Sequence, residues 1–366
     1  TADTPRLVSG LAVTADAQSL PVLWQFGTAL NGIDTNERGE LTLQLPARAV
    51  LVLQAPRLQQ PLVSQALSTL RLRDGIPAEL TRDLTVQGQG AAPHARLQVA
   101  LNGDLTALPP LQADAQGQFS LTLPVRDLGV QRNNLVLFDA KSQHSSPVYS
   151  YQTRQDQAQW QASVSDAADD DKGPTGQYLQ PTQMHSQRQL DIRQVQARAG
   201  GSVLELTLTM AQVSQFWAPA NGFDNVHFSL YFDVPALKSR AQLAQLPGLQ
   251  TVFPGGGRWQ LGHQLFGWGN SVFTADGATA QQTGRKLGAA PSLRVDVARG
   301  QIHIRYQGSA LGVHDWAGTQ IYISTWDKTG EGALRQIGLA PSPWNFGGAS
   351  PQSPKILDDV LLTLPH

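Results

Sequence analysis

Short runs of apolar residues, alternating or continuous, recur along almost the whole chain and are bounded by Gly, Asn, Asp and Pro. This pattern is typical of antiparallel β-strands joined by turns, and amphipathic helical stretches are scarce. The clearest strand segments are residues 39–54, 95–104, 117–125, 133–140, 202–210, 226–234 and 301–308. The pattern therefore predicts an all-β protein built of sandwich domains.

One stretch departs from the strand pattern. Residues 235–248 begin with a proline and end with Pro247-Gly248. Proline in the first turn and glycine just after the last turn are the usual bounds of a helix. We therefore predict one short helix here.

The length of the chain predicts more than one domain, because 366 residues exceed what one ordinary core accommodates. Two stretches, residues 55–65 and 150–160, separate strand-rich segments. We therefore predict three β-sandwich modules in tandem, the last of them the largest and carrying the short helix. Their predicted bounds are residues 1–56, 57–152 and 158–366. Within the second module, Asn102-Gly103 predicts a hairpin turn.

Composition excludes several classes of protein. The formal net charge of −1 gives no basic surface for nucleic acid. No apolar run reaches the ~18 residues that a membrane span needs. The absence of cysteine excludes disulfides, zinc–thiolate sites and thiol nucleophiles. The first residues lack the basic start and apolar run of a signal peptide, so we expect none within this chain.

Catalytic motifs are also missing from the sequence. It contains no G-x-S-x-G elbow, no phosphate-binding loop and no H-E-x-x-H pair. Strands do not alternate with helices as in a (β/α)₈ barrel, and glutamate is rare. We therefore predict that this chain alone is not an enzyme.

An acidic loop is the first candidate for chemistry. Asp166, Asp169, Asp170 and Asp171 lie together, followed by Gly173-Pro174. Carboxylates this close repel one another unless solvent or a cation separates them, and oxygen ligands on a glycine-interrupted loop suit a hard cation such as Ca²⁺. A solvated acidic loop is the alternative.

Tryptophan is the second candidate, because seven of the eight tryptophans lie in the last predicted module. An indole held in a loop can expose a flat face on which a sugar ring stacks, whereas an indole that plugs the end of a sandwich cannot. Trp217 is the strongest candidate, since Pro219 and the Asn221-Gly222 turn hold it at a strand end. The predicted carbohydrate-binding residues are Trp217, Trp268, Trp316 and Trp344, with Asn221 and Asp224 as polar partners.

Histidine and methionine point to no further site. His227 and His303 lie in strand patterns, where we expect a solvent-facing or hydrogen-bonded ring. His185 and Met184 are adjacent, so in an extended strand they cannot share one haem pocket. Haem binding is a remote alternative.

The spacing of residues in the last module carries a family resemblance. One part is Asp166-x-x-x-Asp170-Asp171-x-Gly173-Pro174-x-Gly176-x-Tyr178-x-x-Pro181. It is followed by Leu190-Asp191-Ile192 and by Trp217-x-x-x-Asn221-Gly222-Phe223, and it continues through residues 318–327, 334–335, 344–348 and 357–360. This order resembles the glucodextranase C-terminal-like domain, an accessory β-sandwich related to sugar-binding modules of the DOMON and CBM9 kind. Asp169 departs from the resemblance, because the family usually has a small residue there, often glycine.

The resemblance implies a function. Such domains trail bacterial enzymes that cut α-glucans, so the chain is expected to be the non-catalytic C-terminal region of a secreted or cell-surface glycoside hydrolase acting on dextran, pullulan or starch. The implied partners are an upstream catalytic domain of the same polypeptide and either an α-glucan or a cell-surface polysaccharide. The family pattern also adds Asp191 to Asp166, Asp170 and Asp171 as a Ca²⁺ ligand.

Two weaker resemblances concern the earlier modules. The end of residues 39–54 resembles the last strand of the C-terminal sandwich in α-amylase-type hydrolases, and residues 60–150 resemble bacterial Ig-like spacers. For the last module, attachment to the cell surface is the alternative to sugar binding. An attachment module is expected to show a polar face without an aromatic groove, and a catalytic domain is expected to hold paired carboxylates in a deep pocket.

Overall fold

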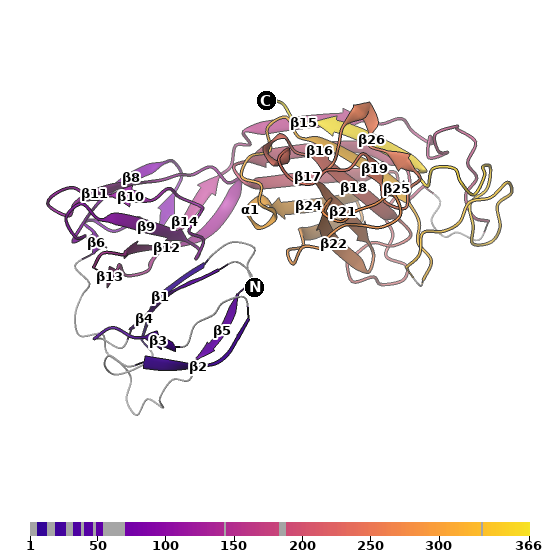
Figure 1. Cartoon of the computed structure of the whole chain (residues 1–366). Helices are drawn as coiled ribbons and strands as arrows, with labels where there is room; N and C mark the ends of the chain where they lie inside the picture. The colour runs from indigo at the N-terminus through magenta and orange to yellow at the C-terminus, as the bar shows by residue number, and fades with distance from the viewer. Residues whose placement is uncertain are drawn as a thin grey trace. The chain divides into compact units, whose positions relative to one another are not determined.

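Strands run through most of the chain in the computed structural model (Figure 1). The structure describes residues 6–12, 19–26, 32–37, 40–46, 49–53, 70–142, 144–182, 188–330 and 332–366. Contacts divide the chain into two units. The first unit consists of Thr1–Val125 with Gly129–Gln155, and the second of Arg126–Leu128 with Asp156–His366.

The N-terminal strands of the first unit form two small sheets. β1 (Arg6–Ala12) pairs with β4 (Glu40–Leu45), and β2 (Ser19–Phe26) lies between β3 (Gly32–Asp34) and β5 (Val50–Leu53). Leu7 packs against Ala100 and Phe138, which belong to the larger sheet of the same unit.

The rest of the first unit is built on two further sheets. The larger follows the order β10-β9-β12-β14-β7, with β13 on β12, and the smaller follows β11-β8-β6. Leucine and valine from both sheets share one core. The bounds are β6 (Arg71–Leu72), β7 (Glu79–Leu80), β8 (Leu84–Gln89), β9 (Arg96–Leu101), β10 (Leu111–Gln112), β11 (Phe119–Leu123), β12 (Gly129–Asp139), β13 (His144–Ser145) and β14 (Tyr149–Gln155).

The second unit is a sandwich of two five-stranded antiparallel sheets. The first sheet has the order β15 (Trp160–Ser165), β16 (Ile192–Gly200), β17 (Val203–Met210), β24 (Gln301–Gln307) and β23 (Ser292–Asp296). The second has the order β22 (Gly269–Thr274), β21 (Leu261–Phe266), β18 (His227–Asp233), β25 (Gln320–Trp326) and β26 (Asp358–Thr363).

Alternation of side chains explains how the two sheets meet. Leu204, Leu206 and Leu208 of β17 enter the same core as Phe228 and Leu230 of β18. On the opposite face of β17, Glu205, Thr207 and Thr209 are half-buried, whereas β18 is buried on both faces. A second cluster covers the outer face of β18, where Tyr231 packs with residues of the segment that follows the strand.

That segment overturns the predicted helix over residues 235–248. Only a single 3-10 turn, η1 (Pro235–Leu237), forms at its start. The chain then makes a hairpin of β19 (Gln245–Leu246) and β20 (Thr251–Val252), followed by η2 (Pro254–Gly256). Leu246 and Leu249 are buried with Tyr231 and Trp259, so packing on the sheet outweighs local helix propensity. The one α-helix among the described residues is α1 (Gly308–Leu311).

The predicted strand segments are confirmed in position, as β4 and β5, β9, β11, β12, β17, β18 and β24. The Asn102-Gly103 turn is also confirmed, with φ of 53° and 79° at its two central residues. The division into three modules stays a prediction. The 55–65 boundary lies outside the described residues, and β14 occupies the 150–160 stretch as far as Gln155. No helix of the described chain is long and apolar enough to cross a membrane.

Candidate functional site

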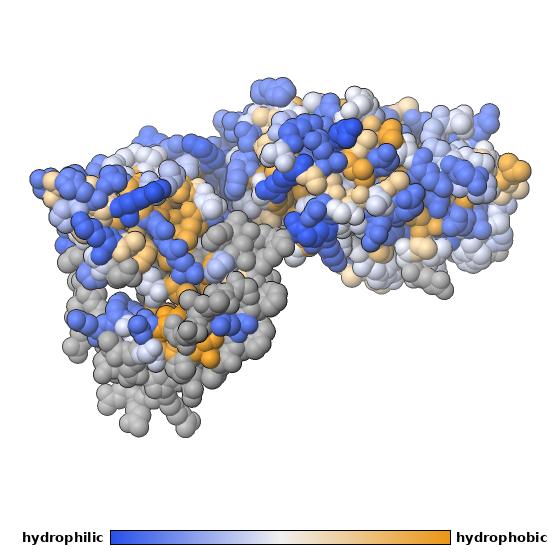
Figure 2. All heavy atoms as spheres, in the orientation of Figure 1, coloured by the Kyte–Doolittle hydropathy of each residue, from blue (hydrophilic) through white to orange (hydrophobic). Residues whose placement is uncertain are grey.

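Loops at one end of the second sheet enclose a cavity of about 450 Å³, which we call the aromatic pocket. It is lined by residues that precede β18, by the turn between β21 and β22, and by the chain that follows β25. The residues that define it are Trp217, Asn225, Trp268, Lys328, Arg335 and Trp344. On the face shown in Figure 2, hydrophilic residues cover much of the described surface, with smaller apolar areas between them.

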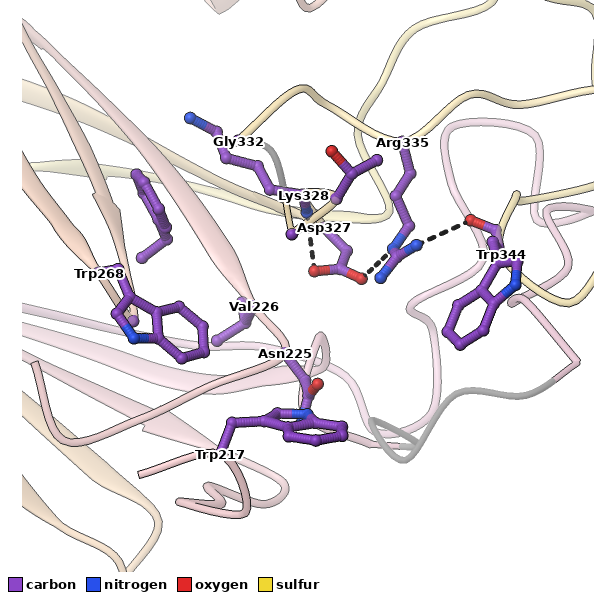
Figure 3. A pocket seen from close by; sticks show the side chains of 13 residues that line it. Trp217, Asn225, Val226, Trp268, Asp327, Lys328, Gly332, Arg335 and Trp344 are labelled. Atoms are coloured by element: carbon purple, nitrogen blue, oxygen red, sulfur yellow. Dashed lines mark hydrogen bonds and ion pairs between the residues drawn. The ribbon is translucent and has the colours of Figure 1, made fainter. Parts of the chain in front are cut away.

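The three indoles of the pocket are exposed to a similar degree. Trp217, Trp268 and Trp344 are 56%, 59% and 58% exposed. Figure 3 shows the three rings around an open space, with Asp327 and Arg335 between Trp268 and Trp344. Each ring comes from a different loop, and each offers apolar surface of the kind on which a sugar ring stacks. The sequence predicted these three residues, and the structure brings them together.

The predicted polar partners, Asn221 and Asp224, support the pocket instead of lining it. Asp224 is buried, and its carboxylate accepts the backbone N–H of Trp217 at 2.6 Å and the amide of Asn225 at 2.8 Å. The side-chain amide of Asn221 donates to the carbonyl of Phe266 at 2.7 Å. The bonds of Asp224 hold the Trp217 loop together, and the bond of Asn221 joins that loop to the end of β21, so both residues position the platform.

Trp316 was predicted as a platform, and that prediction is wrong. Its side chain is fully buried, and its indole N–H donates to the carbonyl of Ser202 at 2.8 Å. It packs against Phe232 and Tyr306 in the sandwich core. The residues after α1 fold back onto the core, so this indole closes the sandwich and offers no face to a ligand.

The charged groups of the pocket were not predicted as site residues. The guanidinium of Arg335 donates to the carboxylate of Asp327 and, at 3.1 Å, to the carbonyl of Trp344. It also lies 5.8 Å from the centre of the Trp344 ring. Burial raises the pKa of Asp327, and the neighbouring Arg335 partly offsets that effect.

Lys328 adds a second positive charge. Its ammonium lies 4.3 Å from the centre of the Phe266 ring, and burial lowers its pKa. The backbone bridge between Lys328 and Leu334 folds the loop so that Asp327 and Arg335 meet. Asp327 and Arg335 belong to the motif segments 318–327 and 334–335, but nothing in their sequence spacing showed that they would form an ion pair.

The acidic loop forms a cluster that differs from the predicted ligand set. Carboxylate oxygens of Asp166, Asp170 and Asp358 all lie within 4.8 Å of one another. Asp358, at the start of β26, was not predicted. Burial, together with the charges of Asp166 and Asp170, raises its pKa to about 8. Burial also raises the pKa of Asp166, whose Oδ2 is buried without a hydrogen-bond partner.

Two predicted ligands have other partners. Asp171 accepts the side-chain amide of Gln180 at 2.6 Å. Asp191 is buried, forms an ion pair with Arg193 at 2.8 Å and accepts the backbone N–H of Asp169 at 3.0 Å. Asp169 has a φ of 61°, a left-handed conformation that favours glycine. A glycine, which the family resemblance leads us to expect at this position, would adopt this conformation without strain.

The histidines in strands are hydrogen-bonded, as predicted. A ring nitrogen of His227 lies 3.1 Å from the hydroxyl of Ser229, and one of His303 lies 3.0 Å from that of Thr207. Met184 and His185, considered for haem, lie outside the described residues.

Comparison with known proteins identifies a family for the second unit. Residues 162–364 match the family model described as the SLH-like C-terminal binding module of glucodextranase. A search of curated proteins finds no match.

Three solved structures show weak likeness to the chain. One is a putative membrane-anchored protein from Corynebacterium diphtheriae, with 8% identity, coverage of 97% of this chain and 88% of that chain, and a TM-score of 0.18. The second is a bacterial ice-binding adhesin, with 10% identity, coverage of 91% and 88%, and a TM-score of 0.14. The third is the N-terminal region of an enterococcal surface protein, with 8% identity, coverage of 80% and 97%, and a TM-score of 0.17. These TM-scores are too low to indicate a shared fold.

Proposed function

Because the chain belongs to the family of SLH-like C-terminal binding modules of glucodextranase, we propose that its second unit binds carbohydrate in the aromatic pocket and has no catalytic role. The observation that carries the proposal is the meeting of three half-exposed indoles from three loops around one cavity. A volume of about 450 Å³ falls within the ~300–1,000 Å³ common for small-ligand sites. The charged and amide groups beside the indoles supply hydrogen bonds to sugar hydroxyls.

The family description supports a wider proposal for the chain. It is the C-terminal region of a secreted or surface-held bacterial glycoside hydrolase whose catalytic domain cuts α-glucans such as dextran, pullulan or starch. An α-glucan is then the first candidate ligand. Attachment to a cell-surface polysaccharide is the second candidate. The aromatic pocket differs from the polar face expected of an attachment module, and the cationic Lys328 inside the pocket is the observation that favours attachment.

Affinity electrophoresis tests the first candidate. The protein should migrate more slowly in gels that contain dextran, pullulan or soluble starch than in plain gels. Equal migration in all of these gels would remove α-glucan as the ligand and leave the surface polysaccharide.

Replacing Trp217 by alanine should weaken binding of the retarding polysaccharide by roughly ten- to hundredfold, because loss of a stacked aromatic costs on the order of 1–3 kcal/mol. Dissociation constants come from retardation as a function of polysaccharide concentration. Leu339→Ala is the control, since Leu339 is highly exposed and does not line the pocket. A folded Trp217→Ala protein that is retarded as strongly as the parent would exclude Trp217 from the site.

We also propose that Ca²⁺ binds to Asp166, Asp170 and Asp358. The residues fit a hard cation, because they offer three oxygen ligands close together and one buried oxygen without a partner. The ion would neutralise the cluster and join the acidic loop to the start of β26. This ligand set replaces Asp171 and Asp191 by Asp358.

The cluster predicts a specific pH dependence in the presence of chelator. The pKa of Asp358 is about 8 in the folded protein, above the ~4 of an unfolded aspartate, so the folded state binds the proton more tightly. The contribution of Asp358 to the free energy of unfolding is therefore fully present below about pH 4, and it is lost as the pH rises towards 8. Millimolar Ca²⁺ should offset part of the loss near pH 8, adding about 2.7 kcal/mol at a hundredfold excess over Kd. Thermal unfolding across this pH range, with and without Ca²⁺, measures both effects.

Asp358→Asn sharpens this test. The amide oxygen can still accept the backbone N–H of Ile192, which Asp358 now accepts at 2.6 Å, but the charge is gone. The variant should unfold at a higher temperature than the parent in chelator at pH 8 and should respond weakly to Ca²⁺. Asp276→Asn, at an exposed carboxylate outside the cluster, should keep the full Ca²⁺ response. A parent protein indifferent to both chelator and Ca²⁺ would mean that the loop is only solvated.

A further inference from the structure

Lys328 places a positive charge on the wall of the aromatic pocket. Its ammonium lies 4.3 Å from the centre of the Phe266 ring, and both residues line the cavity. Figure 3 shows its side chain on the same side of the pocket as Asp327 and Arg335. A half-buried ammonium has lost part of its water shell, which costs free energy unless another group replaces the water.

The described carboxylates near this pocket already accept hydrogen bonds from other groups. Asp327 accepts the guanidinium of Arg335 with one oxygen and the backbone N–H of Lys328, at 2.7 Å, with the other. Asp224 is buried and accepts from Trp217 and Asn225. Within the described residues no carboxylate forms an ion pair with the ammonium of Lys328. Arg335 and Asp327 cancel, so the described lining has a net charge of +1. Glu331 lies outside the described residues.

We infer, on the basis of the proposed function, that the aromatic pocket prefers an acidic saccharide, a sugar that carries a carboxylate or a phosphate, with Lys328 as its counter-ion. Because α-glucans are neutral, this inference favours the cell-surface polysaccharide of the two candidate ligands. The indoles would stack on the ring, and the ammonium would bind the anionic substituent. A charge-assisted hydrogen bond in a partly desolvated site is stronger than a bond to a neutral hydroxyl. A neutral sugar uses the indoles but offers the ammonium of Lys328 no anionic group.

Matched ligands test the charge directly. Methyl α-glucoside and the corresponding methyl glucuronide share one ring and differ by a hydroxymethyl group against a carboxylate. Glucose 6-phosphate adds the phosphate arm, so the pair of acidic ligands shows which anion the site takes. Quenching of tryptophan fluorescence at low ionic strength gives the dissociation constants. We expect at least one acidic ligand to bind roughly ten- to hundredfold more tightly than the glucoside, the range for a hydrogen bond to a charged group.

Variants separate this inference from the proposed function. Lys328→Met should abolish the preference, so that the acidic ligand binds no more tightly than the glucoside. Lys286→Met, at an exposed lysine that does not line the pocket, should keep the preference. Trp217→Ala should weaken the binding of both the neutral and the acidic ligand.

Each adverse result has a distinct meaning. If the parent binds neutral and acidic ligands with equal affinity, and Lys328→Met has the same affinities as the parent, the acidic preference is overturned and carbohydrate binding stays in place. A preference that survives in Lys328→Met would remove Lys328 as the counter-ion. Failure of every sugar to bind, with Trp217→Ala equal to the parent, would overturn the proposed function itself.

Discussion

Trp316→Ala is expected to lower the free energy of unfolding of the second unit by about 3–5 kcal/mol, the usual cost of deleting a buried large aromatic side chain. Trp316 has no exposed surface and packs against Phe232 and Tyr306. Its removal leaves a cavity between the two sheets and removes the indole donor to the carbonyl of Ser202, which keeps only the backbone N–H of Gly308. Chemical denaturation followed by far-ultraviolet circular dichroism and by calorimetry measures the change.

Trp268→Ala is the matched control for this prediction. The same side chain is deleted, but Trp268 is 59% exposed in the aromatic pocket, so the expected cost is below about 1 kcal/mol. Binding should respond in the opposite order, with a loss for Trp268→Ala and none for any Trp316→Ala protein that remains folded. Similar stability losses in both variants would contradict the assignment of Trp316 to the core and Trp268 to the surface.

These two tryptophans also show where sequence reasoning reached its limit. Alternation of apolar residues is a local property, so the strand segments, including β17 and β18, could be predicted from it. The exposure of a loop tryptophan is not local, because it depends on which surface the loop covers. All four candidate tryptophans lie between strands and were predicted to be exposed. The prediction is correct for Trp217, Trp268 and Trp344 and wrong for Trp316, which is buried.

The helix and the acidic cluster failed for the same physical reason. Residues 235–248 have good helix bounds, yet Leu246 and Leu249 gain more by packing on the outer face of the second sheet. The acidic cluster takes its third carboxylate from Asp358, far along the chain from Asp166 and Asp170. Contacts of β26 with β15 and β16 bring these segments together, and only the three-dimensional fold contains that information.

Arg335→Met is expected to cost about 3–5 kcal/mol of stability at pH 7, because it leaves a buried charge without its partner. Asp327 is only 6% exposed, and its carboxylate depends on the guanidinium of Arg335. Without that guanidinium, burial raises the pKa of Asp327 further above its unfolded value. A raised pKa means that stability is lost as the pH rises, so the variant should recover stability when the pH is lowered towards 4. Denaturation at pH 7 and at pH 5 measures this recovery.

Two further variants identify the cause of the loss. Arg285→Met breaks the exposed pair with Asp276 and should cost less than about 1 kcal/mol. Adding Asp327→Asn to Arg335→Met removes the stranded charge and should restore much of the loss at pH 7, with little recovery on acidification. Sugar binding should stay weak in this double variant, because Trp344 still lacks the donor to its carbonyl and the cation beside its ring. A double variant as unstable as Arg335→Met at pH 7 would show that the lost packing of the arginine, and not the unpaired carboxylate, is the cause.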